Sequence, residues 1–340
     1  MINVGVVGLG FAAAKHLKAY RQLRGVRIAA LCNPSGRHLD GDFAGVSGNI
    51  GGDKPLRLDM SGVEAYRDFY GLLANPEIHL VDICAPTSAH PELAIAALKA
   101  GRHVVCEKPL ARTPGHARKI VNAAKSAKGF LMPAMCMRFW PEWVWAKRAV
   151  EGRNYGKVLA ARFRRVCQAP VWNRKSYLDG KNSGGALLDL HIHDVDFVQW
   201  LFGRPLGVFS SGLSRFTGAV DHVVTQYKVR GGAAVSAEAS WLMTQGFGFN
   251  MSYTLIFERA TADYDFARGA EALRIWEEGQ GTRVIRCAAA DAYVEELHHM
   301  IESIQSGKPP GVVTAQDALS AIEICEAEER SIRSGRVVSV

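Results

Sequence analysis

Short apolar runs alternate with amphipathic stretches along the first 135 residues. Apolar positions at helical spacing predict helices over Phe11–Leu23, Glu64–Leu73, Pro91–Ala100 and Pro114–Ala127. Runs of strand length lie between them, at Asn3–Val7, Arg27–Cys32, His79–Cys84, His103–Cys106 and Phe130–Ala134. Strands that alternate with helices of this size form parallel sheets. We therefore expect an α/β fold, with a doubly wound parallel sheet over residues 1–135.

The pattern changes after about residue 140. Predicted strands now follow one another, several with turn residues directly between them, at Val158–Cys167, Gly207–Phe216, His222–Val229, Ala233–Leu242 and Phe249–Phe257. Such a succession is typical of an antiparallel sheet. Two helical patterns, Tyr293–Ser306 and Ala315–Arg333, close the chain. We expect residues 136–340 to form a second, α+β domain on a large, mostly antiparallel open sheet.

Composition and charge exclude several classes of protein. The 340 residues are 48% hydrophobic and 22% charged, which excludes a disordered chain. Lys and Arg exceed Asp and Glu by 41 to 33, yet they form no run longer than two, so nucleic acid is not an expected partner. No apolar run approaches the ~18 residues that a membrane helix needs, so a membrane is not expected either.

The cysteines indicate the compartment. There are seven, an odd number, and none belongs to a Cys-x-x-Cys pair. This favours reduced, buried thiols over a disulfide framework or a metal site. The chain begins with strand-like sequence and without an export leader. We expect a cytoplasmic protein with no bound metal.

The first chemical signal is Gly8-Leu9-Gly10-Phe11-Ala12-Ala13, which follows a predicted strand and opens a predicted helix. This is the G-x-G-x-x-A form of the dinucleotide fingerprint. Gly8 permits the tight turn, Gly10 lets a pyrophosphate approach the backbone, and Ala13 allows close packing of helix on strand. The alternative is a Gly-rich turn without a ligand, but the strand–turn–helix context favours the dinucleotide.

The end of the second predicted strand bears on the choice of cofactor. Asn33 stands where NAD enzymes usually place an acidic residue on the ribose diol, and an amide does not repel a 2′-phosphate. Ser35 and Arg37 follow closely enough to bind such a phosphate. The residues therefore leave NAD and NADP open. The Gly- and Asp-rich stretch 34–60 is long for a connection and is a candidate to fold over the adenosine end of the cofactor.

Two further groups of residues are typical of proton transfer. Lys108 follows the predicted strand His103–Cys106, at the edge of the sheet where ligands bind; the alternative is a surface lysine. Asp189 and His193 are spaced i and i+4 on a predicted apolar helix, so a carboxylate faces an imidazole. The alternative for His193 is a core histidine that its neighbour satisfies.

These motifs together resemble the glucose–fructose oxidoreductase / inositol dehydrogenase / MocA (Gfo/Idh/MocA) family. Gly8-x-Gly10-x-x-Ala13, Glu107-Lys108-Pro109 and Gly184-Gly185-x-x-x-Asp189-x-x-x-His193 occur in the order and spacing of that family. Cys84-Ala85-Pro86-Thr87 with His90, Arg138-Phe139-x-Pro141 and Ser306-Gly307-Lys308-Pro309 add to the likeness, which covers essentially the whole chain.

The resemblance implies a Rossmann domain followed by a domain whose open sheet contacts substrate and forms a homo-oligomer, a dimer or tetramer. It implies that Lys108 binds the reacting hydroxyl, that His193 is the acid/base, and that Asp189 orients His193 or the substrate. The Lys108–Pro109 bond is a candidate for cis geometry. The cofactor contacts that it implies are Gly8, Gly10, Phe11, Ala12, Ala13, Asn33, Ser35, Arg37, Ala85, Pro86, Thr87, His90, Glu107 and Lys108.

Three features depart from the family pattern or bear on the substrate. His191 stands where many members have Gly, which predicts an imidazole near the substrate. Trp172 and Asn173 precede the helix of Asp189, with an aromatic face for a sugar ring and an amide for hydroxyls. Arg164 is a candidate for an acidic sugar, although a solvated or paired arginine is the favoured interpretation.

Three functions remain at this stage. The first is an NAD(P)-dependent oxidoreductase that moves hydride between nicotinamide and a carbinol or carbonyl of a sugar, cyclitol or related polyol. The second is a redox-neutral enzyme that oxidises a sugar transiently with tightly bound NAD. The third is a non-catalytic sensor of a dinucleotide or metabolite, which has no need of the set Lys108, Asp189 and His193. We expect the first.

Overall fold

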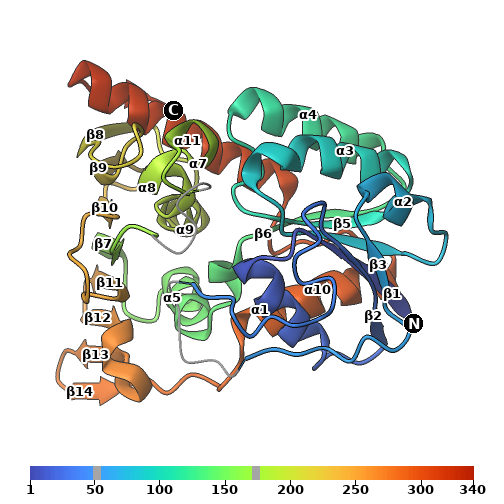
Figure 1. Ribbon diagram of the computed structural model, residues 1–340. Coiled ribbons are helices and arrows are strands. Elements are labelled where there is room, and N and C mark those ends of the chain that lie inside the picture. The colour runs from blue at the N-terminus through green and yellow to red at the C-terminus, as the bar shows by residue number, and fades with distance from the viewer. Residues whose placement is uncertain (49–54, 171–176) are drawn as a thin grey trace. The chain divides into compact units, whose positions relative to one another are not determined.

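The computed structural model describes residues 1–48, 55–170 and 177–340 (Figure 1). Contacts between Cα atoms divide the chain into two compact units. Unit 1 comprises residues 1–139 and 290–319, and unit 2 comprises residues 140–289 and 320–340. The chain thus returns to unit 1 at residue 290 and ends in unit 2, whereas the sequence pattern assigned all of residues 136–340 to the second domain.

Unit 1 is built on a six-stranded sheet in which every neighbouring pair is parallel. Its order is β3-β2-β1-β4-β5-β6, which is the order of a Rossmann fold and confirms the predicted fold class. The strands are β1 (Ile2–Val7), β2 (Val26–Cys32), β3 (Glu64–Tyr66), β4 (Leu80–Ile83), β5 (His103–Glu107) and β6 (Leu131–Ala134).

Helices cover both faces of this sheet. In Figure 1, α3 and α4 lie on one side of it and α1 and α10 on the other. The helices are α1 (Phe11–Tyr20), α2 (Phe69–Ala74), α3 (His90–Lys99), α4 (Pro114–Ser126) and α10 (Ala292–Ser306), with short 3₁₀ turns η1 (Thr87–Ala89) and η2 (Cys136–Phe139). Side chains cap several of them: Asp68 accepts the Gly71 N–H at the start of α2, and Thr113 accepts the His116 N–H at the start of α4.

One predicted element of unit 1 is wrong. The pattern predicted a helix over Glu64–Leu73, but the structure has strand β3 followed by the shorter helix α2. Glu64, Ala65 and Tyr66 pair with Ala30–Cys32 of β2, and this backbone pairing at the edge of the sheet overrides the local helical pattern.

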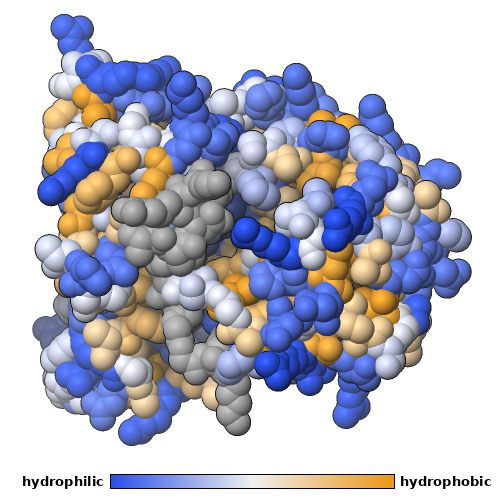
Figure 2. Space-filling view, in the orientation of Figure 1, coloured by the Kyte–Doolittle hydropathy of each residue, from blue (hydrophilic) through white to orange (hydrophobic). Residues whose placement is uncertain are grey.

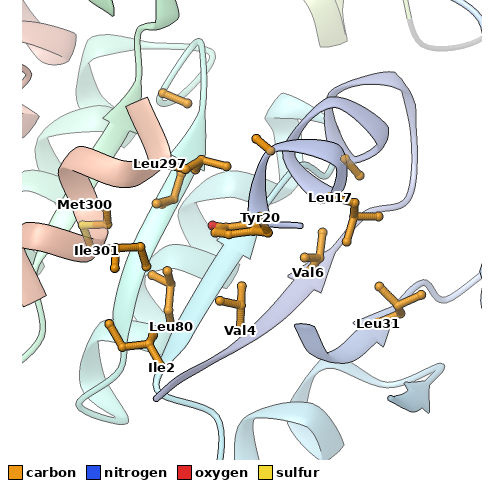
Figure 3. Packing of buried hydrophobic residues seen from close by; sticks show 14 of the residues in the cluster. Ile2, Val4, Val6, Leu17, Tyr20, Leu31, Leu80, Leu297, Met300 and Ile301 are labelled. Carbon is orange, nitrogen blue, oxygen red and sulfur yellow. The ribbon is translucent and has the colours of Figure 1, made fainter. Parts of the chain in front are cut away.

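Helix α10 completes the core of unit 1 although it is distant in sequence. Leu297, Met300 and Ile301 are buried in one cluster with Leu17 and Tyr20 of α1 (Figure 3). The same cluster includes Ile2, Val4 and Val6 of β1. This packing of α10 explains why residues 290–319 belong to unit 1.

Unit 2 is built on a nine-stranded sheet of order β14-β13-β12-β11-β7-β10-β9-β8-β15. All its neighbouring pairs are antiparallel except the parallel pair β7 and β10, so the predicted mostly antiparallel sheet is confirmed. The strands are β7 (Val158–Cys167), β8 (Gly207–Leu213), β9 (His222–Lys228), β10 (Ala234–Ser240), β11 (Phe249–Phe257), β12 (Ala260–Asp265), β13 (Leu273–Glu277), β14 (Gly281–Val284) and β15 (Val338–Ser339), with the 3₁₀ segment η4 (Phe266–Glu271).

One face of this sheet packs against helices. Trp143 is fully buried against Phe163 of β7, Phe197 of α9 and Tyr253 of β11, with ring centroids 6.2, 4.5 and 5.3 Å away. The helices are α5 (Pro141–Gly152), α7 (Gly180–Ser183), α8 (Gly185–Asp189), α9 (Ile192–Phe202) and α11 (Ala315–Ser334). The sequence pattern did not predict α5 or strands β12 to β15.

The opposite face of the nine-stranded sheet carries exposed apolar side chains among polar ones. Phe209 and Ile256 are each 42% exposed, and Val224 and Trp276 are 38% and 40% exposed. Elsewhere hydrophilic residues dominate the surface seen in Figure 2, with smaller hydrophobic patches among them. Within the described ranges, no helix has the length and apolar character to span a bilayer.

Candidate functional site

The fingerprint forms the turn from β1 into α1, and its first glycine is required by the backbone. Gly8 has a φ of 84°, and its N–H donates to the Cys32 carbonyl at 2.9 Å. A Cβ at Gly8 would lie 2.4 Å from the Cα of Ala85, so no larger residue fits between β1 and the end of β4. Gly8 therefore brings the ends of two neighbouring strands together.

The second glycine faces open space. A Cβ built on Gly10 would have no other atom within 4 Å, apart from its chain neighbours. Gly10 is also the N-cap of α1, whose first turn carries no acidic residue, while Ala13 is fully buried beneath it. Free N–H groups at a helix N-terminus beside an unfilled space fit the pyrophosphate of a dinucleotide.

The side chain of Asn33, just beyond β2, organises the turn that follows. Its Nδ2 donates to the Arg37 carbonyl at 2.8 Å, and its Oδ1 accepts from the Ser35 Oγ at 3.1 Å. Sequence reasoning missed Arg67, which follows β3: a Cβ on Gly36 would lie 2.8 Å from an Arg67 guanidinium nitrogen. Ser35, Arg37 and Arg67 thus gather at the end of β2 and β3, where the ribose of a dinucleotide lies in this fold.

The long connection after Asn33 reaches the fingerprint. A Cβ on Gly48 would lie 2.3 Å from the ring of Phe11, so this backbone lies on the first residue of α1. Phe43 and Leu56, at 2% and 3% exposed, anchor the connection in the core of unit 1. Gly48 thus brings the connection to the start of α1, and its place over the adenosine end of the cofactor stays a prediction.

The segment that follows β4 is held in place by the buried side chain of His90. Ala85, Pro86 and Thr87 lead into η1, and His90 is buried at the start of α3. The His90 Nε2 lies 2.8 Å from the Ala85 carbonyl and its Nδ1 2.9 Å from the Pro109 carbonyl. Burial lowers the pKa of His90 in spite of these two hydrogen bonds. His90 therefore ties two loops of the predicted cofactor site together.

Lys108 follows β5 at the same edge of the sheet, and the Lys108–Pro109 bond is cis as expected. Glu107 turns inward: its Oε2 accepts the Lys108 N–H at 2.9 Å, and its Oε1 lies 3.3 Å from His16 Nε2. His16 in turn lies 2.8 Å from Asp82. Sequence reasoning missed His16 and Asp82; the available signal was a charged residue inside the apolar strand Leu80–Ile83.

Asp189 and His193 do not lie on one continuous helix as predicted. Asp189 is the last residue of α8, and His193 lies in the first turn of α9. The break falls at Leu190 and His191, where the His191 N–H donates back to the Ala186 carbonyl at 2.8 Å instead of continuing the regular pattern. The i, i+4 spacing of the pair therefore spans a break in the helix, and both residues lie at one helix junction.

Two glycines and a buried ion pair fix this junction. Gly184 and Gly185 have φ of 81° and 68°, and a Cβ on Gly185 would lie 2.5 Å from the Val220 carbonyl oxygen. Arg165 of β7 binds Asp194 of α9 through two contacts of 3.0 and 3.1 Å, with both side chains buried. The helix that bears His193 is thus anchored to the sheet one residue away.

His191 is not exposed to a substrate. Its Nε2 lies 3.3 Å from Glu328 Oε1 and 3.1 Å from the Tyr227 hydroxyl, and all three side chains are buried. Burial opposes protonation, but the charge of Glu328 raises the pKa of His191. The expected imidazole near the substrate is instead an internal link between α9, β9 and α11.

The predicted substrate residues divide into two groups. Trp172 and Asn173 lie outside the described residues. Arg164 alternates along β7 with the buried Phe163 and Arg165, so it lies on the sheet face opposite α9, where its Nε pairs with Glu238 Oε2 at 3.2 Å. The structure thus supports the paired-arginine interpretation and does not bring Arg164 to Asp189 and His193.

Comparison with known families decides the assignment. The model described as "Oxidoreductase family, NAD-binding Rossmann fold" matches residues 2–135, and the GFO/IDH/MocA C-terminal domain matches residues 143–263. The chain belongs to the Gfo/Idh/MocA family. It is therefore an oxidoreductase with an NAD-binding Rossmann domain, and the resemblance seen in the motifs is confirmed.

Relatives of this Gfo/Idh/MocA protein match over nearly their whole length. It is 26% identical to myo-inositol 2-dehydrogenase of Thermotoga maritima, over 100% of this chain and 98% of the relative. It is 27% identical to scyllo-inositol 2-dehydrogenase (NAD(+)) of Bacillus subtilis, over 82% and 83%. The structure of levoglucosan dehydrogenase in complex with NADH superposes with a TM-score of 0.85 at 22% identity, over 100% and 99%, which shows a shared fold.

Proposed function

We propose that this protein is an NAD(P)-dependent dehydrogenase that acts on a secondary alcohol of a cyclitol, sugar or related polyol. The observation that carries the proposal is the shape of the fingerprint, with Gly8 packed on Ala85 and Gly10 facing open space at the start of α1. Lys108 lies at the same edge of the sheet, after β5. The printed names of the relatives, inositol and levoglucosan dehydrogenases, support the class of substrate.

The roles that we propose for Lys108, Asp189 and His193 are those that the family resemblance implies. His193 acts as the acid/base, Lys108 binds the reacting hydroxyl, and Asp189 orients the substrate or His193. When bound, the nicotinamide supplies the acceptor for the hydride. The first turn of α1 and the turn at Asn33 hold the dinucleotide, and His90 and Glu107 brace the loops around it.

The choice between NAD and NADP rests on the turn after β2. Asn33 is uncharged, so it does not repel a 2′-phosphate as an acidic residue would. Nearby, Ser35 offers a hydroxyl, and Arg37 and Arg67 each offer a guanidinium group. An amide also binds a ribose hydroxyl. NAD⁺ and NADP⁺ must therefore both be tested as cofactors.

We also propose a homo-oligomer that forms through the open face of the nine-stranded sheet, where exposed apolar side chains gather. The seven cysteines are thiols, and on this ground we propose a location in the cytoplasm.

The function is tested by nicotinamide absorbance. Purified protein receives NAD⁺ or NADP⁺ with a panel of cyclitols, aldoses, anhydrosugars and uronates, in parallel with the variants Lys108→Ala and Arg21→Gln. Arg21 is exposed at the end of α1 and serves as the matched control. We expect reduction of the cofactor, at least about 100-fold slower in Lys108→Ala, because one positioned proton-transfer group contributes about that much or more.

The other outcomes separate the alternatives. A cofactor that remains bound through purification, with no net reduction by any substrate, would favour transient oxidation in a redox-neutral enzyme. Undiminished activity of Lys108→Ala would contradict the role of Lys108. Failure to bind NADH or NADPH would contradict the proposal as a whole.

A further inference from the structure

A charged group lies buried beneath the fingerprint, in the core of unit 1. His16 lies on α1, three residues after Ala13, and Asp82 lies on β4; both side chains are fully buried. Glu107, at the end of β5, is 13% exposed through its side chain. Three elements of the Rossmann unit, including the helix of the fingerprint, thus contribute a charge to one place. Buried charges persist when they are paired with one another.

The contacts form a continuous chain that ends at Lys108. Asp82 Oδ2 lies 2.8 Å from His16 Nδ1, and Glu107 Oε1 lies 3.3 Å from His16 Nε2, within ion-pair distance. The second oxygen of Glu107 accepts the backbone N–H of Lys108 at 2.9 Å. A rotation of the Glu107 side chain would therefore break its ion pair and leave the Lys108 N–H without this acceptor.

The geometry favours a protonated ring at His16. The Nδ1 atom lies within hydrogen-bond distance of Asp82, and the Nε2 atom, which has no hydrogen-bond partner of regular geometry among the described residues, lies within ion-pair distance of Glu107. Burial alone would lower the pKa of His16, but the charge and hydrogen bond of Asp82 raise it well above the usual value. Burial also opposes the ionisation of Glu107, yet the hydrogen bond and charge of His16 lower its pKa.

Other titratable groups near His16 in the described part of the chain have pKa values that oppose their ionisation. Burial is the first cause in each case, and it raises the pKa of Tyr20, Cys84, Cys106, Tyr293 and Glu296. The imidazolium of His16 therefore has two anionic neighbours, Asp82 and Glu107, and one of them holds the main chain at Lys108.

We propose that His16 is a positioning residue, which acts through Glu107 to hold Lys108 in place relative to the helix that binds the cofactor. The inference rests on the proposed function in that Lys108 is the group that it positions. A displacement of about 1 Å in a catalytic group can cost about 100-fold in rate, so a rigid link between α1 and the end of β5 has a direct effect on turnover.

A metal ion is the competing occupant of this place. The donor atoms of His16, Asp82 and Cys84 lie within 4.8 Å of one another. However, the 2.8 Å separation of His16 and Asp82 is that of a hydrogen bond, and metals bind the thiolate, which burial disfavours at Cys84. We therefore assign the group as a proton-sharing network.

The first test uses nuclear magnetic resonance and does not depend on turnover. With ¹⁵N-labelled histidine in the full-length protein, and His16→Gln to assign the signal, we expect His16 to keep both ring protons at a pH above the usual pKa of histidine, about 6.5. We also expect the Lys108 amide signal to move in His16→Gln and in Glu107→Gln, and to stay in Arg21→Gln. A neutral His16, an unmoved Lys108 amide in His16→Gln, or one tightly bound metal ion per chain would overturn the proposal. Asp82→Asn replaces His16→Gln if that variant does not fold.

The second test measures turnover with the substrate identified in the absorbance assay. We expect kcat to fall about 10- to 100-fold in His16→Gln, with the KM of substrate and the Kd of NADH within about threefold of wild type. The double variant His16→Gln/Glu107→Gln should be no slower than the slower single variant, because both changes break one chain of contacts. Additive losses, or a loss of NADH binding alone, would overturn it. Full activity of Lys108→Ala would instead contradict the proposed role of Lys108. The magnetic resonance experiment would still test the contacts of His16 and Glu107, because it does not depend on that role.

Discussion

Gly8 and Gly10 lie two residues apart in one turn, yet the structure uses them differently. Gly8 has no room for a side chain, because the backbone at Ala85 occupies the position of its Cβ. Gly10 has room for one, and the open space beside it is what a pyrophosphate requires. The two positions therefore separate the folding role of the fingerprint from its binding role.

Alanine at each position should give opposite results. Gly10→Ala should leave the Tm within about a degree of wild type but raise the Kd of NADH at least about tenfold, because the added methyl group meets only the ligand. Gly8→Ala should lower the stability of the protein by more than about 2 kcal/mol, because a left-handed φ and a clash with Ala85 combine. Calorimetry and NADH fluorescence measure the two effects. Equal losses of stability in both variants would contradict this division.

At this scale, sequence motifs predicted residues whose chemistry is tied to a fixed spacing. Gly8, Gly10 and Lys108 are examples, and the structure places them at the edge of the sheet where they were expected. His16 and Asp82 could not be paired in advance, because only the parallel register of the strands brings α1 and β4 together. The pairing of Arg164 with Glu238 likewise depends on the register of β7 and β10.

Helix α10 brings an acid into the core of unit 1. Glu296 is fully buried, and neither carboxyl oxygen has a hydrogen-bond partner among the described residues. Burial raises its pKa well above the usual value, so the folded protein holds a proton there that the unfolded chain releases above about pH 4.3. Stability from such a group is complete below the unfolded pKa and is lost as the pH rises through the folded pKa.

The stability of the protein should therefore fall as the pH rises above the unfolded pKa of Glu296, about 4.3, by up to about 1.4 kcal/mol per pH unit for each such group. The pKa of His16 is also raised, so His16 lowers the stability further as the pH rises above about 6.5. The pKa of Glu107 is lowered, so Glu107 affects the stability only in more acidic solution. Glu296→Gln should flatten this dependence, as calorimetric Tm values across the range would show. Glu302→Gln, an exposed change on the same helix, is the control, and an unchanged slope in Glu296→Gln would refute the assignment.

Whole elements were predicted well where one pattern governed a long segment. Strands Val158–Cys167 and Phe249–Phe257 have the predicted bounds. The errors lie where tertiary pairing overrides a local pattern, as at β3, or where a continuous apolar pattern conceals a break, as at Leu190 and His191. Helix α5 contains Trp143 and Trp145 in a stretch that gave no clear periodicity, and its burial depends on the sheet against which Trp143 packs.

At the scale of the whole molecule, the open face of the nine-stranded sheet is the surface that we expect a partner to cover. Its exposed apolar residues come from strands distant in sequence, including Phe209 of β8, Val224 of β9 and Ile256 of β11. A second copy of the chain would bury them, as the resemblance to the family implied. The sequence alone could not define this surface, because the strand order that assembles it is not consecutive.

We expect the protein to be a dimer or tetramer by size-exclusion chromatography with light scattering. The double variant Val224→Glu/Ile256→Glu should form a smaller assembly in solution, because the added carboxylates lie on the face that the interface would bury. Tyr70→Ser, which changes an exposed aromatic residue of unit 1, should keep the mass of the wild type. A monomeric wild type, or an unchanged mass in the double variant, would show that this face is not an interface between copies.

The return of the chain to unit 1 has a consequence for the order of events during translation. The segment 1–139 leaves the ribosome early, but Leu297, Met300 and Ile301 of its core are synthesised only after strands β7 to β14 of unit 2. The nascent Rossmann unit must therefore wait with an exposed apolar surface, next to α1, until α10 emerges. Binding of a dinucleotide to the nascent chain should accordingly be a late event, and a messenger truncated before α10 should yield a product that chaperones retain.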